Sequence, residues 1–186
     1  IQEACKRGLW EELGNGYITK KPKPKTTEVV IVADGSPDDN GEVRLKIDVA
    51  NGGANPRIHY HEDGAVSETS KVLTDNVLLT KALRVQFLAV DPTGKNQTGA
   101  PTTWVNRLVL RNRFDEVKRT VELYVAPKGK ICYTLDGSEA RNGTEYSTPI
   151  EIGAQAATVY VFAECDGLEA KATFQFPAAG SNKVNL

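Results

Sequence analysis

A run of alternating apolar and polar residues that ends in an Asp-Gly turn occurs twice in this chain. The clear copy is Ile131–Glu139, and the weaker copy is Ile58–Gly64. Further along each copy, a second β-rich run ends on a small residue, Ala163 or Ala89. A repeat of this length predicts two similar β domains in tandem, each large enough to have its own core.

Short β-type runs separated by turn residues fill most of the chain. Val43–Val49, for example, alternates apolar and charged residues, which is the pattern of a half-buried antiparallel strand. No helical pattern separates the runs, so a parallel α/β sheet is excluded. The sequence therefore predicts an all-β fold of two tandem immunoglobulin-like antiparallel β-sandwiches.

The first residues differ from the rest. Apolar residues recur every four positions over residues 1–13, which predicts a short N-terminal helix, and Lys20–Lys25 alternates lysine with proline as a linker does. Residues 102–110 are expected to form the last strand of the first sandwich, and 111–118 the polar joint. The predicted organisation is a helix and basic linker at 1–26, a first sandwich at 27–111, a second sandwich at 112–178 and a tail at 179–186.

The charge balance restricts the partners. The formal net charge is −1, so no global field attracts nucleic acid or an anionic membrane. The positive segment Lys20–Lys25 is read most simply as a solvated linker. A nucleic-acid or lipid contact through it is the alternative, weakened because no aromatic residue interleaves with the lysines. No segment has the apolar length of a membrane span, so no membrane partner is expected.

Cysteine usage bears on the compartment. Cys5, Cys132 and Cys165 form an odd set without the spacing of a disulfide framework, which favours a reduced, cytoplasmic protein. One bridge between Cys132 and Cys165 stays open as an alternative. The chain starts at Ile1 and contains no Met, which we interpret as a segment of a longer polypeptide.

The motif has further landmarks after its turn. The run Ile131–Glu139 is followed by Gly143, Tyr146, Pro149-Ile150 and Ala163. With these residues, the stretch of about 119–176 resembles the C-terminal domain of chitobiases and β-hexosaminidases. The chain departs from that family at Ala140, where proline is usual. Residues 40–110 look like a diverged copy that keeps Tyr60, Asp63-Gly64 and Ala89.

The layout of helix, basic linker and two β domains also resembles the C-terminal end of large phage-defence-associated ATPases of unknown function. The first resemblance implies an appendage outside any catalytic domain. Together they predict a non-catalytic C-terminal accessory module of a larger, ATP-hydrolysing bacterial protein, acting in protein–protein contact or assembly. Its partners would be the upstream domains of the same polypeptide and other proteins. The alternative is a carbohydrate-binding or spacer appendage of a glycoside hydrolase.

No residues have the pattern of an active site, so the predicted catalytic, cofactor and metal residues are none. His59 and His61 share a strand face and could supply two metal ligands, although a solvated sheet face is the simpler interpretation. Asp38-Asp39 and Glu62-Asp63 fit turns, and the bidentate glutamate of a calcium loop is missing. Trp104 is expected in the core, with stacking on a sugar or a partner chain as the alternative.

The two copies of the motif differ on the face opposite their tyrosines. The first has His59 and His61 where the second has Cys132 and Thr134. The shared residues build a strand, a turn and a core. We therefore expect any binding surface on the variable face or in the upstream chain, and we expect Tyr133 in the core.

Overall fold

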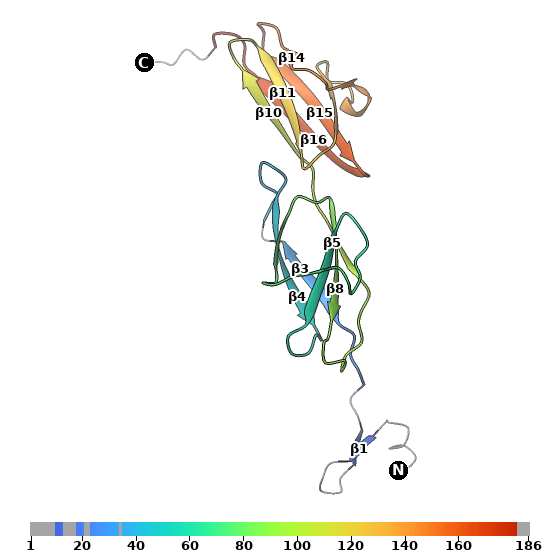
Figure 1. Ribbon diagram of the computed structural model, residues 1–186. Coiled ribbons are helices and arrows are strands. Elements are labelled where there is room, and N and C mark those ends of the chain that lie inside the picture. Colours follow the sequence, from blue (N-terminus) through green and yellow to red (C-terminus); the bar gives the residue numbers. More distant parts are fainter. Residues whose placement is uncertain (1–9, 13–17, 21–22, 34, 182–186) are drawn as a thin grey trace.

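The computed structural model describes residues 10–12, 18–20, 23–33 and 35–181, and this part of the chain is all-β (Figure 1). Its one helical element is a 3-10 turn, η1 (Ala140–Asn142). The predicted N-terminal helix is wrong at Trp10–Glu12, which form strand β1 and pair antiparallel with β2 (Ile18–Lys20). A lone amphipathic helix is stable only where another element covers its apolar stripe. Residues 1–9 and 13 of that prediction lie outside the described residues.

The first β unit contains two sheets with the strand orders β3-β4-β7 and β6-β5-β8-β9, all pairs antiparallel. Its strands are β3 (Glu28–Ala33), β4 (Val43–Ala50), β5 (Arg57–Glu62), β6 (Lys71–Val72), β7 (Val77–Thr80), β8 (Arg84–Val90) and β9 (Thr102–Val105).

The second β unit has the orders β10-β11-β14 and β13-β12-β15-β16, again antiparallel. Its strands are β10 (Val109–Asp115), β11 (Thr120–Ala126), β12 (Lys130–Thr134), β13 (Thr144–Glu145), β14 (Ile150–Glu151), β15 (Ala157–Cys165) and β16 (Leu168–Phe176).

The strand orders of the two units correspond position by position, so β3 is equivalent to β10, β5 to β12 and β8 to β15. Each unit is a sandwich, because its buried apolar residues come from both of its sheets. The fully buried centre of the first core includes Leu45, Ile58 and Phe87, and that of the second includes Val121 and Val159. Period-two alternation places these side chains inward along each strand.

The registers place the motif in the centre of its sheet. Ile131 pairs with Ala163 and Tyr133 with Val161, just as Ile58 pairs with Ala89 and Tyr60 with Phe87 in the first unit. The small alanine therefore lies opposite the isoleucine in both units. Tyr133 packs against the second core as expected, and its ring centroid lies 6.5 Å from that of Tyr146 in an edge-to-face arrangement.

The connection between the units differs from the prediction. The expected last strand at 102–110 is two strands, with β9 ending at Val105 and β10 beginning at Val109. The expected polar joint at 111–118 is mostly β10, and the boundary drawn at 111 falls inside it. The polar joint was predicted there because of Arg111 and Arg113. Polar residues on the outward face of a strand resemble a loop in sequence.

The sheet that carries Cys132 and Cys165 keeps them from forming a disulfide. Both thiols are free. Cys165 packs against the second core, whereas Cys132 lies opposite Phe162 on the other face of the same sheet. Side chains that point away from each other across a sheet cannot form a disulfide without movement of the backbone.

Candidate functional site

The junction between the two units brings together segments that are far apart in the sequence. The turn between β3 and β4 meets β10 and the turn between β11 and β12, while the two units lie end to end (Figure 1). We take this junction as the first candidate site, because its contacts fix how the units are presented.

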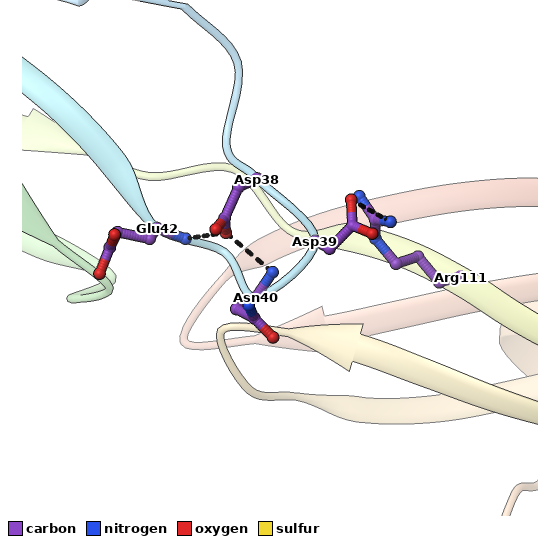
Figure 2. Close-up of polar contacts among 5 residues, drawn as sticks. All are labelled: Asp38, Asp39, Asn40, Glu42 and Arg111. Carbon is purple, nitrogen blue, oxygen red and sulfur yellow. Dashed lines mark hydrogen bonds and ion pairs between the residues drawn. The ribbon is translucent and has the colours of Figure 1, made fainter.

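Asp38 shapes the turn from which the first unit reaches the second. Its Oδ1 accepts hydrogen bonds of 2.8 Å from the backbone N–H groups of both Glu42 and Asn40 (Figure 2). These two bonds hold the pKa of Asp38 below its ordinary value, that from Glu42 contributing most. The predicted acidic pair Asp38-Asp39 is therefore a turn, and its two carboxylates have separate partners.

Asp39 pairs across the junction with Arg111 of β10, and Figure 2 shows the two side chains facing each other. The Asp39 side chain is 79% exposed. Exposed ion pairs contribute about 0–1 kcal/mol, because water screens them and two long side chains must be ordered. This contact orients the turn but cannot hold the units together alone.

A buried amide joins three segments at the same place. Asn106, in the connection between β9 and β10, donates from Nδ2 to the carbonyl oxygens of Gly41 (3.0 Å) and Ala82 (3.1 Å). Its Oδ1 accepts from the backbone N–H of Arg107. A buried amide with both groups satisfied is costly to replace, since truncation leaves its partners unpaired.

Gly41 lets the two backbones touch. It has φ +75°, and a Cβ at this position would lie 2.7 Å from the backbone nitrogen of Pro127 in the second unit. A larger residue would have to push the units apart there. Gly41 therefore sets the approach distance at the junction.

The first unit also supplies a side chain to the second core. Leu83, directly before β8, is 2% exposed and belongs to the cluster formed by residues of the second unit. Next to it, Arg84 donates from Nη2 to the carbonyl oxygen of Asp166 at 2.7 Å, in the turn between β15 and β16. Burial of a leucine stabilises by about 1.5–3 kcal/mol, which exceeds the surface ion pair.

The Asp-Gly turn of the motif is satisfied internally. Asp136 Oδ1 accepts from the Ser138 hydroxyl (2.6 Å) and backbone N–H (3.0 Å), and these bonds lower the pKa of Asp136. Thr134 Oγ1 donates to the Ser138 carbonyl oxygen at 2.9 Å. The motif thus closes its own turn.

The face opposite the tyrosines is not the open surface that the sequence predicted. His59 is 6% exposed, and its Nδ1 lies 3.1 Å from the carbonyl oxygen of Ser70 in the segment that connects β5 to β6. Its cross-strand neighbour Leu88 is also buried. Only His61 is exposed, so the expectation of a solvated face is wrong for His59. The reason is that the following loop folds back over the sheet.

The equivalent face of the second unit is covered in the same way by different residues. Cys132 and Phe162 are buried there, and the Arg141 guanidinium of η1 lies 4.6 Å above the centre of the Phe162 ring. Gly143 permits this return of the chain, because a Cβ there would lie 2.2 Å from the Tyr133 carbonyl oxygen. The loops after β5 and β12, rather than the sheets, form the variable surface.

A shallow hollow lies beside η1 and is the second candidate site. The Arg141–Glu169 and Lys171–Glu139 ion pairs border it, and Tyr160 contributes a half-buried ring. The full lining is Ser138, Glu139, Ala140, Arg141, Tyr160, Val161, Phe162, Lys171, Ala172 and Thr173. Its charges are already neutralised in pairs, which does not favour a strongly charged ligand.

Glu62, Asp63 and Trp104, the other candidates from the sequence, have structural roles. Glu62 accepts a 2.5 Å hydrogen bond from the Thr80 hydroxyl, and Asp63 accepts one of 3.0 Å from the Arg84 backbone N–H, so this acidic pair is divided as well. Trp104 packs against the first core, as expected. The described residues include no group of three or more His, Cys, Asp or Glu placed to hold a metal ion.

Of the basic linker, Lys20 is the last residue of β2, while Lys23 and Lys25 are exposed. Lys21 and Pro22 lie outside the described residues. Within the part of the chain that the structure describes, no helix is long and apolar enough to cross a membrane.

Sequence reasoning missed the residues that make the junction, namely Gly41, Leu83, Asn106 and Arg111. The Asn-Gly pair at 40–41 was a turn signal, but nothing in it identified Pro127 as its neighbour. Contacts between segments separated this widely in sequence depend on the packing of both units.

Residues 113–175 match the family model of the chitobiase/beta-hexosaminidase C-terminal domain. The match covers most of the second β unit and confirms the similarity expected from the motif. A domain of this kind indicates an accessory module. No curated protein matches the chain.

Proposed function

We propose that this chain is a non-catalytic C-terminal accessory module of a larger polypeptide, built from two diverged immunoglobulin-like sandwiches in tandem. It serves protein–protein contact or assembly by presenting its surfaces at a fixed spacing. The observation that carries the proposal is the junction, where Leu83 is buried in the second core and Gly41 touches Pro127. The position-by-position agreement of the two strand orders supports the tandem origin.

The spacing can be tested with one pair of glycines. Gly41→Ala adds a methyl group against Pro127, whereas Gly94→Ala adds the same group at a similar φ of +68° with no atom within 4 Å. Small-angle X-ray scattering of the chain should give a changed distance distribution for Gly41→Ala and an unchanged one for Gly94→Ala. If the parent chain already scatters as two freely moving bodies, the fixed-spacing proposal fails.

The larger protein is proposed to be a cytoplasmic, ATP-hydrolysing bacterial protein. Without the helix, which is wrong at Trp10–Glu12, the layout resemblance rests on the basic linker and the two β domains. These features support the proposed context, and so do two free thiols that the fold keeps apart. The test is to purify the full-length polypeptide with and without these residues. Removal should leave ATP hydrolysis per subunit intact and abolish a protein contact or an assembly state. Glycoside hydrolysis by the full-length protein would contradict the proposal.

The hollow beside η1 favours one alternative, a carbohydrate-binding appendage of a glycoside hydrolase. Tyr160 offers an aromatic ring, and Arg141, Glu139 and Thr173 offer polar groups that can hydrogen-bond to sugar hydroxyls. Binding on a glycan array that Tyr160→Ala removes would support this alternative. An array without binding would exclude it.

A further inference from the structure

The two units differ in how their equivalent first strands meet solvent. On the outer face of its sheet, β3 carries Val30 and Val32, which are 43% and 51% exposed. At the equivalent place β10 carries Arg111 and Arg113, opposite Tyr124 and Glu122 of β11. Charged side chains on an edge strand oppose the addition of another strand. β10 has this protection at its centre, whereas β3 has a charge only at its first residue, Glu28.

β3 lies at the edge of its sheet. Among the described residues it pairs with β4 alone, since the order is β3-β4-β7. Residues 29–33 contain no charge, proline or glycine. The opposite face of the strand is anchored on the first core through Val29 and Ile31. An edge segment without charges, held in place by a core, is a ready template for a further strand.

We infer that β3 is a strand-addition surface and that its partner is β3 of a second copy of this chain, paired antiparallel about a two-fold axis at Ile31. The inference rests on the proposed contact function and specifies its surface and its partner. A two-fold contact requires a surface that is complementary to itself.

The valines meet this requirement. In an antiparallel pair centred on Ile31, Val30 of one copy lies opposite Val32 of the other, and the reverse pair forms on the other side of the axis. Directly opposite residues share a face with Cβ atoms about 4.5–5.5 Å apart. Four half-exposed valines thereby become one apolar cluster.

The charges that flank the valines are complementary in the same register. On β4, Asp48 lies beside Val30 and Lys46 beside Val32. With Ile31 at the axis, each row of side chains across the joined sheets contains Val30 of one copy and Val32 of the other. Such a row begins with Asp48 of the first copy and ends with Lys46 of the second. An axis at Val30 or Val32 would instead place two like charges at the ends of the central row. Of these three registers, the one centred on Ile31 is therefore the one whose valine rows end in unlike charges. Beyond residues 29–33 it would bring Glu28 of one copy opposite Asp34 of the other, so the pairing is inferred over residues 29–33.

The test uses charge exchange on the full chain, followed by sedimentation velocity from about 1 to about 200 µM. The chain should dimerise with rising concentration. V30K or V32D alone should raise the dissociation constant by about tenfold or more, because each buries one charge in the valine cluster. The double variant V30K/V32D should return it to within about threefold of the parent, because the new lysine and aspartate lie opposite each other in this register.

The control is V117K, which adds the same charge at a residue that is 95% exposed in the turn between β10 and β11. It should leave dimerisation unchanged. Since Val30 and Val32 face solvent, circular dichroism melts should show folded variants throughout. A parent chain that stays monomeric overturns the inference, as does a dimer that V30K leaves intact or that the double variant fails to restore. None of these outcomes bears on the spacing of the units within one chain, which the Gly41 variant tests separately.

Discussion

In the first β unit, the buried residue on the outer face of the central strand is His59, covered by the segment that ends at Ser70. In the second it is Cys132, covered by η1 with Arg141 stacked on Phe162. The strand order beneath these covers is the same. The comparison teaches that the alternating inward residues give both units the same strand order. The two units differ in the loops and edge strands that surround their sheets.

The edges extend this contrast. The outer sheet face of the second unit pairs charges with polar groups, as in Arg113 opposite Glu122. The corresponding face of the first unit leaves Val30, Val32 and Leu79 exposed. One unit is therefore built to face water there, and the other retains an apolar surface suited to contact.

The largest expected effect comes from removing the motif tyrosines. Tyr133→Ala should lower the free energy of unfolding of the second unit by about 3 kcal/mol, because it removes an aromatic ring packed on the core and on Tyr146. Tyr60→Ala should cost the first unit a similar amount, since Tyr60 packs on the first core beside Phe87. Trp104 packs on the first core, and replacing the second tryptophan by Trp10→Phe makes the fluorescence report on Trp104. Calorimetry combined with this fluorescence assigns each loss to its unit. An unchanged melt for Tyr133→Ala would place this tyrosine outside the core.

A comparable effect is expected where the units share a core. Leu83→Ala should destabilise the second unit by about 2–4 kcal/mol, although Leu83 lies within the sequence of the first unit. If Leu83 couples the units, one calorimetric transition should separate into two. Leu79→Ala is the matched control, because Leu79 is 60% exposed and should change little. Equal effects of the two variants would contradict the coupling.

Low pH should destabilise the two units to different extents, by less than the core substitutions do. The pKa is lowered for Asp38 and Asp91 in the first unit, and for Asp136 in the second, in each case chiefly by hydrogen bonds to the carboxylate. A carboxyl group with a depressed folded pKa contributes stability above its unfolded value of about 3.9, and this is lost as the pH falls through the folded pKa.

The first unit should therefore lose more stability than the second between about pH 5 and about pH 2. Asp91→Asn tests the assignment, because an amide cannot accept all the bonds from Thr93 and Asn96 that the carboxylate accepts. It should flatten the acid dependence of the Trp104 signal. A dependence as steep as that of the parent would exclude Asp91 as its source.

The smallest effect is expected from the exposed ion pair at the junction. Asp39→Ala should reduce stability by less than about 1 kcal/mol, and the reduction should fade in high salt. Urea unfolding at low and high salt measures it. A loss of several kcal/mol, comparable to that of Leu83→Ala, would mean that this pair and not the buried leucine holds the units together.

The fold was largely predictable and the site was not. Tyr133, Ile131 and Ala163 were assigned to the core from alternation and from comparison of the two copies, and residues 113–175 match the expected domain family. The division at 102–118 failed because Arg111 and Arg113 mark an outward face that looks like a loop in sequence. The predicted helix failed at Trp10–Glu12, where a period of four residues did not settle the local structure.

The sequence by itself determined the strands, the Asp-Gly turns and the inward tyrosines, because side-chain alternation and turn chemistry act over a few neighbouring residues. Only the tertiary structure decided which faces are covered, which core receives Leu83, and why Cys132 and Cys165 stay apart. Those outcomes depend on the paths of loops and on contacts between distant segments. The Asp-Gly motif therefore identifies the fold, while the junction and the edge of β3 at residues 29–33 are where a function should be sought.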